Sequence, residues 1–261
     1  MSRLPAPRKW QAPAVAHDAR AKQAAAAVLH AALGQARANA RGAAESANPE
    51  YLHQLRVGLR RYRSALRVFR PLLRKAPRKR LAREAREAMQ PLGEARDWDV
   101  CLEWLQRAKA PEALLRRVRG RRDAARRNLR VPRLDALAPD QTVWKAKPES
   151  LRQYRVRALG KTRRKVAKRL RGIDWDEPAQ RHRLRIAVKR LRYAIGFLGG
   201  DEPKALEDLQ DVLGELNDIA VARRLLADLL PPSSVLRKLD AAERRLIAAS
   251  GRQTAALDLE D

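Results

Sequence analysis

The sequence predicts an all-α protein made of two helical halves, and three observations lead to that fold class. Apolar residues recur at helical spacing, and no segment shows the strict apolar–polar alternation of a half-buried strand. Aromatic residues make up only 4% of the 261 residues, which disfavours a large β-sandwich or barrel. Two short motifs occur twice in the same order, which indicates an internal duplication. We therefore expect two homologous helical halves, each of about four helices.

Helix signals and prolines divide the chain into helices and connections. Asn48-Pro49-Glu50 predicts a helix start, because it combines an asparagine cap, a proline in the first turn and an acid near the helix dipole. Three prolines between residues 131 and 149 indicate a linker. Helices are expected near residues 17–41, 49–74, 77–88, 92–109, 112–130, 150–171, 178–198, 203–230 and 233–249. The expected parts are a flexible N-terminal segment (1–16), a first half (17–131), a linker (132–149), a second half (150–250) and a C-terminal tail (251–261).

The charge balance indicates a polyanionic partner. The chain has 58 Lys and Arg against 30 Asp and Glu, a net charge of +28. The excess is local: residues 151–200 hold 16 basic and 3 acidic residues, whereas residues 201–261 hold 8 and 13. No run of 18 apolar residues predicts a membrane span. The single cysteine, Cys101, excludes an intramolecular disulfide and fits a reducing compartment.

Two motifs each occur twice in the chain, and one begins with a histidine whereas the other begins with a leucine. His53-Gln-Leu-Arg-Val-Gly-Leu-Arg-Arg-Tyr-Arg63 pairs with His182-Arg-Leu-Arg-Ile-Ala-Val-Lys-Arg-Leu-Arg192, at an offset of 129 residues. Further along, Leu92-Gly-Glu-Ala-Arg-Asp97 pairs with Leu213-Gly-Glu-Leu-Asn-Asp218. Ordered pairs of this kind indicate two related helical halves.

The histidine motif places cations along one side of its helix. At about 100° per residue, His53 and the arginines that follow it lie within an arc of roughly 80°, with apolar residues on both sides. A solvated charged face normally mixes signs, whereas this row has no acid, so we favour an anion-binding groove over a solvated face. Guanidinium groups repeated on successive turns suit a linear chain of phosphates. The predicted binding residues are His53, Arg56, Arg60, Arg63, Arg67, Arg157, Lys161, Arg164, His182, Arg185, Lys189 and Arg192.

The repeated histidines and carboxylates each allow two interpretations. The helix dipole and the neighbouring arginines disfavour the imidazolium form of His53 and His182, so they are expected to act as neutral donors to phosphate, or else to pack against a neighbouring helix. Surrounding cations disfavour a metal site at these histidines. The repeated carboxylates are interpreted as structural partners of the row arginines, with a Mg²⁺ or Ca²⁺ site as the alternative. These carboxylates are Glu94, Asp97, Glu215 and Asp218.

Both pairs of motifs resemble those of the CHAD family, the conserved histidine α-helical domain. The resemblance covers roughly residues 17–250 and implies two four-helix bundles related by pseudo-twofold symmetry, with inorganic polyphosphate bound by basic residues around the two histidines. We expect the polyphosphate to lie in a basic groove between the two bundles, along the facing histidine helices. It also implies association with polyphosphate granules in the bacterial cytoplasm. Trp98 stands in an often aliphatic position of the family, and Asn217 replaces the arginine that the first copy has at Arg96.

The sequence favours a binding protein over an enzyme. No phosphate-binding glycine loop, dinucleotide fingerprint, metalloprotease motif or nucleophile elbow is present, and no cofactor is expected. The expected ligand is inorganic polyphosphate, and free phosphate or sulfate would occupy the same donors. Nucleic acid is the first alternative, although Tyr62 and Tyr193 fall off the cationic row, and an enzyme acting on phosphoanhydrides is the second. The arginine-rich segment 116–133 is either a second contact surface or a solvated helix.

Overall fold

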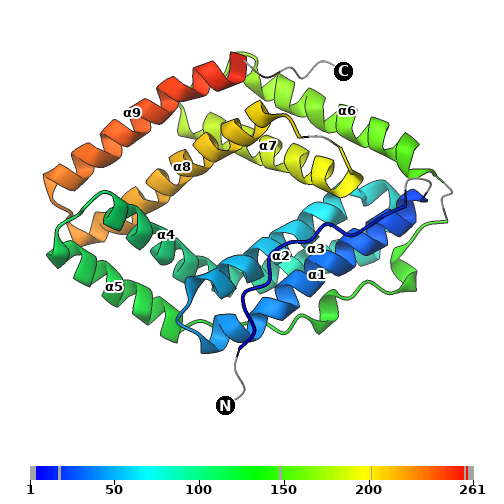
Figure 1. The fold of residues 1–261 in the computed structure, drawn as a ribbon, viewed down its shortest axis with the longest axis horizontal. Helices are drawn as coiled ribbons and strands as arrows, with labels where there is room; N and C mark the ends of the chain where they lie inside the picture. The colour runs from blue at the N-terminus through cyan, green and yellow to red at the C-terminus, as the bar shows by residue number, and fades with distance from the viewer. Residues whose placement is uncertain (1–3, 17–18, 147–148, 201, 256, 258–261) are drawn as a thin grey trace. The chain divides into compact units, whose positions relative to one another are not determined.

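Helices dominate the structure, a computed structural model that describes residues 4–16, 19–146, 149–200, 202–255 and 257. These residues form nine α-helices and no β-strand, which confirms the predicted all-α class (Figure 1). The internal duplication stays a prediction. None of the described helices has an apolar stretch long enough to cross a membrane. The helices are α1 (Ala21–Glu45), α2 (Pro49–Val68), α3 (Lys75–Met89), α4 (Gly93–Arg107), α5 (Glu112–Arg127), α6 (Leu151–Leu170), α7 (Pro178–Leu198), α8 (Lys204–Leu226) and α9 (Ser233–Ala255).

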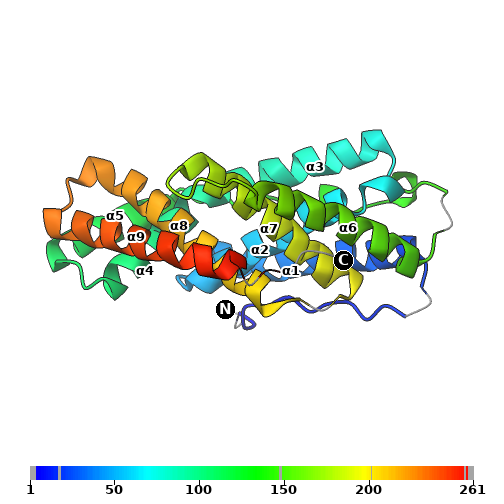
Figure 2. The same cartoon turned by 90° about the horizontal axis from the view of Figure 1, so that it is seen from above.

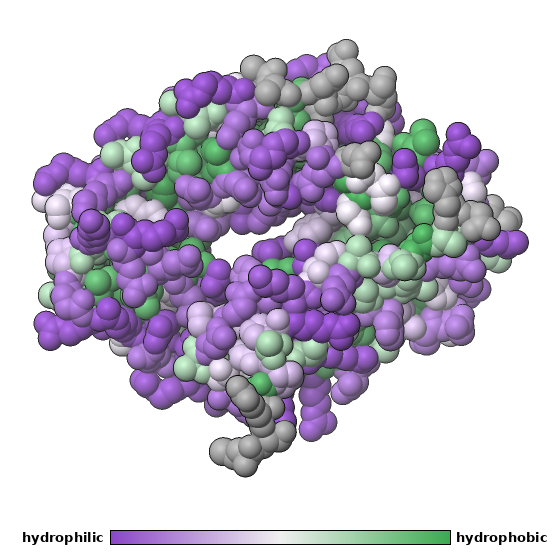
Figure 3. Space-filling model, viewed as in Figure 1, coloured by the Kyte–Doolittle hydropathy of each residue, from purple (hydrophilic) through white to green (hydrophobic). Residues whose placement is uncertain are grey.

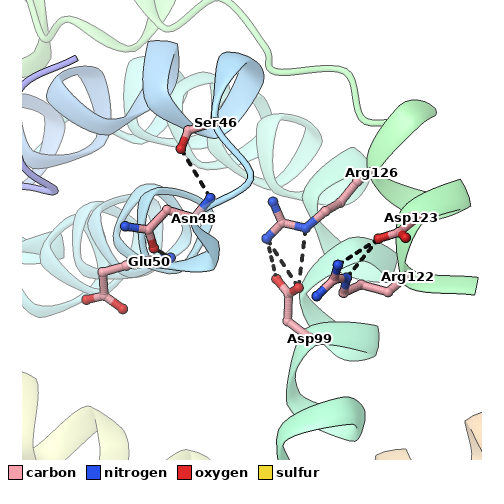
Figure 4. Close-up of polar contacts among 7 residues, drawn as sticks. All are labelled: Ser46, Asn48, Glu50, Asp99, Arg122, Asp123 and Arg126. Carbon is pink, nitrogen blue, oxygen red and sulfur yellow. Dashed lines mark hydrogen bonds and ion pairs between the residues drawn. The ribbon is translucent and has the colours of Figure 1, made fainter. Parts of the chain in front are cut away.

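Helix α2 begins as predicted and ends earlier than predicted. The Asn48 Oδ1 atom accepts a hydrogen bond from the Glu50 backbone N–H at 2.9 Å and caps the helix (Figure 4). The helix stops at Val68 instead of continuing to residue 74. The cause is Pro71, which lacks an N–H and whose ring would clash with a helical carbonyl, so residues 70–72 form a short 3₁₀ turn instead.

Pro91 has the same effect between α3 and α4. It lies in a 3₁₀ turn, Gln90–Leu92, that separates the two helices. Residues 21–127 therefore hold five α-helices, because the interrupted helical region predicted over residues 77–109 forms two separate helices.

The described chain divides into two compact units whose bounds differ from those of the repeat. Unit 1 comprises residues 1–93, 129–161 and 193–201, and unit 2 comprises residues 94–128, 162–192 and 202–261. Both α6 and α7 contribute residues to each unit. The predicted domain bounds, which follow the sequence repeat rather than contacts, stay a prediction.

The core of unit 1 is the pairing of α1 with α2, which lie side by side in both ribbon views (Figures 1 and 2). Leu52, Leu55 and Leu59 on α2 are completely buried. Gly58 lets the two helices approach closely, because a Cβ atom there would lie only 2.7 Å from the backbone nitrogen of Ala36. The buried apolar face of α2 thus fixes the rotation of the helix about its axis.

The N-terminal segment 4–16 packs along unit 1 as an extended chain (Figure 2). The Tyr51 hydroxyl donates to the Pro5 carbonyl at 2.7 Å. The buried Asn39 side chain accepts from the Arg8 N–H at 3.1 Å and donates to its carbonyl at 2.9 Å. The prolines at positions 5, 7 and 13 predict a flexible lead-in here. No local pattern signals these contacts, because Asn39 and Tyr51 are distant in sequence from the segment.

Unit 2 is held by apolar packing of α8 against α9 and by buried ion pairs. The Asp99 carboxylate is almost fully buried on α4 and accepts from the Arg126 guanidinium of α5 at 2.9 and 3.2 Å (Figure 4). Arg181, which is 6% exposed, donates to Glu243 on α9 at 2.6 Å. The first pair joins the consecutive helices α4 and α5, and the second joins α7 to α9.

Candidate anion-binding site

The predicted cationic row of the first half runs along α2 in unit 1. Since the leucine face of α2 is buried against α1, the row lies on the side of the helix away from that contact. His53, Arg56, Arg60 and Arg63 are half-buried, and Arg67 is exposed. The predicted side chains of this helix thus share one accessible face.

Three arginines of the α2 row have no carboxylate partner among the residues that the structure describes. Arg60, Arg63 and Arg67 form no ion pair there. Burial and then repulsion by Arg67 and Arg86 lower the pKa of Arg63, and burial lowers that of Arg67. A bound anion would relieve this repulsion and partly offset the cost of desolvation.

Tyr193 joins this row in the folded structure. Its hydroxyl accepts a hydrogen bond from Arg60 Nε at 2.9 Å, across 133 residues of sequence. The Tyr193 ring stacks on Phe197 with centroids 5.8 Å apart and planes at 13°, and Trp10 meets Phe197 edge-on at 6.0 Å. The hydroxyl thus restricts the orientation of the Arg60 guanidinium. Helical spacing did not predict this role, because Tyr193 lies outside the cationic row of its own helix. The one signal in the sequence is its position directly after the second histidine motif, which ends at Arg192.

The cationic row of the second half, on α7 in unit 2, has carboxylates nearby. His182 is exposed, and Arg185 and Lys189 are half-buried. Asp218 interacts electrostatically with both of these cations and with Arg96, and burial raises its pKa in spite of them. The interpretation of Asp218 as a structural partner of row cations stays a prediction.

Two predicted binding residues are already neutralised. Arg192 contacts Glu202 and also Glu207, the latter at 3.6 Å. Arg157 pairs with Glu149 at 2.9 Å and lies over the Tyr154 ring at 5.3 Å. Each would have to exchange a carboxylate for phosphate. By contrast, Lys161 and Arg164 on α6 are exposed.

The predicted site residues are divided between the two units. Unit 1 contains the α2 row, Arg157 and Lys161, and unit 2 contains Arg164 and the α7 row. The predicted groove between two bundles stays a prediction. Figure 3 shows that hydrophilic residues cover much of the molecular face drawn there.

The remaining repeated carboxylates differ in their surroundings. Asp97 pairs at 3.1 Å with Arg224, which is not a row residue. Glu94 and Glu215 are exposed. The buried carboxylate of α4 is instead Asp99, which the motif comparison did not single out. Within the described part of the chain, no three histidine, cysteine or carboxylate side chains lie grouped so that they could hold a metal ion.

The fold and this surface define a class: an all-α protein with histidine-led cationic rows on two of its helices. The family model described as the CHAD domain matches residues 27–227, and the chain belongs to that family. Its structure is similar to the crystal structure of the CHAD domain from the plant Ricinus communis, with a TM-score of 0.72 and 29% identity, covering 98% of this chain and 99% of that one. It also shares its fold with PptA from Streptomyces chartreusis, with a TM-score of 0.64 and 19% identity, covering 91% and 98%. No match was found among curated proteins.

Proposed function

We propose that this protein binds inorganic polyphosphate through the cationic rows on α2 and α7, without acting as an enzyme. One observation carries the proposal: Arg60, Arg63 and Arg67 form a row of guanidinium groups with no carboxylate partner among the described residues. Membership of the CHAD family, which is linked to polyphosphate, supports it.

The spacing of the row favours a linear chain of phosphates. Residues three and four apart on an α-helix recur about every 5.4 Å along its axis, so successive arginines can bind successive phosphoryl groups. A nucleic-acid strand would gain most from aromatic rings that are open to stacking. Tyr193, the tyrosine beside the row, already stacks one face of its ring on Phe197. This arrangement favours a ligand without bases.

The proposed function also implies a subcellular localisation. A protein that binds long polyphosphate in the cytoplasm would collect at polyphosphate granules. Free phosphate or sulfate would compete only weakly, because a single ion occupies one or two guanidinium groups rather than a row.

A competition experiment tests the proposed ligand. Protein bound to labelled polyphosphate is titrated with RNA, DNA or inorganic phosphate at one fixed salt concentration, because each phosphate contact adds to the salt dependence. We expect unlabelled polyphosphate to displace the label at a much lower charge concentration than RNA or DNA does. Equal displacement by nucleic acid would refute the proposal. Chain shortening of polyphosphate in Mg²⁺ that is lost in Arg60→Ala would refute its non-enzymatic part.

Replacing Tyr193 by phenylalanine is expected to weaken polyphosphate binding about 2- to 10-fold, since a hydrogen bond contributes roughly 0.5–1.5 kcal/mol. The variant keeps the ring stack on Phe197 and loses only the acceptor for Arg60. Tyr51→Phe is the matched control, because its hydroxyl donates to the Pro5 carbonyl at 2.7 Å and not to a row residue. Binding is measured by titration at fixed salt; a Tyr193→Phe affinity equal to that of the unchanged protein would contradict the role.

A further inference from the structure

A separate hollow lies entirely within unit 2, where α4, α8 and α9 meet. Its volume is about 580 Å³, within the usual range of small-molecule sites. Three alanines, Ala108, Ala241 and Ala242, leave space that larger side chains would fill, and Ile219 adds an apolar surface. None of the predicted binding residues of the cationic rows lines this hollow. The hollow therefore has cations of its own, and Asp218 is the lining residue that also interacts with the α7 row.

The lining of the hollow combines the indole ring of Trp104 with cationic side chains. Trp104 is half-buried, so part of its ring faces the open space. The side chains of Arg107 and Arg245 line the same space and are exposed. Neither side chain forms a hydrogen bond or ion pair with any described residue. Lys238 is held in place by its bond to the Ala108 carbonyl at 2.6 Å. An aromatic surface and two available guanidinium groups thus adjoin one cavity.

Two carboxylates also line the hollow, and they differ in their electrostatic surroundings. Asp218 interacts electrostatically with three cations that do not line the hollow, namely Arg96, Arg185 and Lys189, and burial raises its pKa. Its charge partners are therefore cations that lie outside the lining of the hollow. Glu215 is exposed and forms no ion pair with any described residue, so it can accept a hydrogen bond from a ligand hydroxyl or amino group. The hollow as a whole is cationic with one available acceptor.

We propose that this hollow binds a nucleoside phosphate. The base stacks on Trp104, the phosphates accept from Arg107 and Arg245, and a ribose hydroxyl or base amino group donates to Glu215. A bare phosphate chain would use the two arginines and leave the indole and the carboxylate without a role. A neutral nucleoside would use the indole and leave the arginines without a role. Only a ligand that joins a flat ring to phosphates satisfies every exposed group.

Calorimetric titration with ATP, adenosine and tripolyphosphate at one salt concentration tests the ligand class, with the cationic rows first saturated by long-chain polyphosphate so that the titration reports on the hollow. We expect ATP to bind at least about tenfold more tightly than either of the others, because stacking of a base on an aromatic side chain contributes a factor of this size. Tripolyphosphate binding as tightly as ATP would overturn the proposal, since the base would then add nothing.

Two adjacent arginines on α9 provide a matched pair of variants. Arg244 and Arg245 are both exposed, but only Arg245 lines the hollow. Arg245→Glu is expected to weaken ATP binding at least about tenfold, as a charge-assisted hydrogen bond is lost and repulsion is added, whereas Arg244→Glu changes it less than about twofold. Equal losses would indicate a diffuse field and overturn the proposal.

Variants of Trp104 test the stacking. Trp104→Ala is expected to reduce ATP affinity to that of tripolyphosphate, and Trp104→Phe, which keeps a ring and the packing, is expected to retain most of the preference for ATP. Circular dichroism checks that each variant is folded. A full preference for ATP in folded Trp104→Ala would place the nucleotide elsewhere and overturn the assignment. Arg60→Glu, which alters the α2 row, is expected to leave the ATP preference unchanged.

Discussion

Reversing the charges of Arg60 and Lys189 together is expected to weaken polyphosphate binding by about 100-fold or more. Each reversal removes a charge-assisted hydrogen bond, worth roughly 1.5–3 kcal/mol, and adds a repelling carboxylate beside the ligand. Arg60 has no carboxylate partner in the described structure, and its orientation is fixed by Tyr193, so the loss of its contact is not compensated nearby. Titration of the double variant with labelled polyphosphate at fixed salt measures the effect.

The matched control is a double charge reversal on α5. Arg121→Glu with Arg122→Glu changes the net charge equally, but Arg121 is simply exposed and Arg122 already pairs with Asp123 at 2.8 Å. We expect this control to weaken binding only several-fold, through the long-range field. The salt dependence provides a second measurement, since lost phosphate contacts flatten its slope. Equal losses in both double variants would show that the net charge, rather than the rows, binds the ligand.

Replacing Asp99 by alanine is expected to lower the free energy of unfolding by about 3–5 kcal/mol, the usual cost of leaving one member of a buried ion pair uncompensated. The Asp99 side chain is 5% exposed and that of Arg126 is 14% exposed, so water cannot replace the lost carboxylate freely. The two oxygens of Asp99 accept from Arg126 at 2.9 to 3.3 Å (Figure 4). Chemical denaturation followed by circular dichroism measures the change.

Asp123→Ala serves as the control for Asp99→Ala. Asp123 pairs with Arg122 on the same helix, and its side chain is 48% exposed. Exposed pairs contribute about 0–1 kcal/mol, so this variant should unfold nearly as the unchanged protein does. Similar midpoints for the two variants would contradict the structural importance assigned to Asp99.

Local signals predicted most helices, because caps, prolines and helical periodicity act within a few residues. The Asn48 cap begins α2 where it was expected. The predicted end of α2, at residue 74, is too late, because Pro71 stops the helix before that point. The packing of residues 4–16 could not be predicted, since partners such as Asn39 and Tyr51 are distant in sequence.

The candidate site likewise has features that local spacing predicted and features that depend on distant residues. Helical spacing alone placed His53, Arg56 and Arg60 on one face of α2, and the structure keeps them accessible. The spacing could not show that Glu202 and Glu207 neutralise Arg192, or that Glu149 neutralises Arg157. Which cations remain available depends on carboxylates that other segments bring near.

Residue patterns are enough to predict the helical class, the cationic rows and the resemblance to the CHAD family, because each depends on residues within one or two turns of a helix. The folded structure is needed to see that Tyr193 holds Arg60, that Asp99 is buried against Arg126, and that Trp104 adjoins Arg245 in one hollow. These contacts join residues that are distant along the chain, so they arise only when apolar burial packs the helices together.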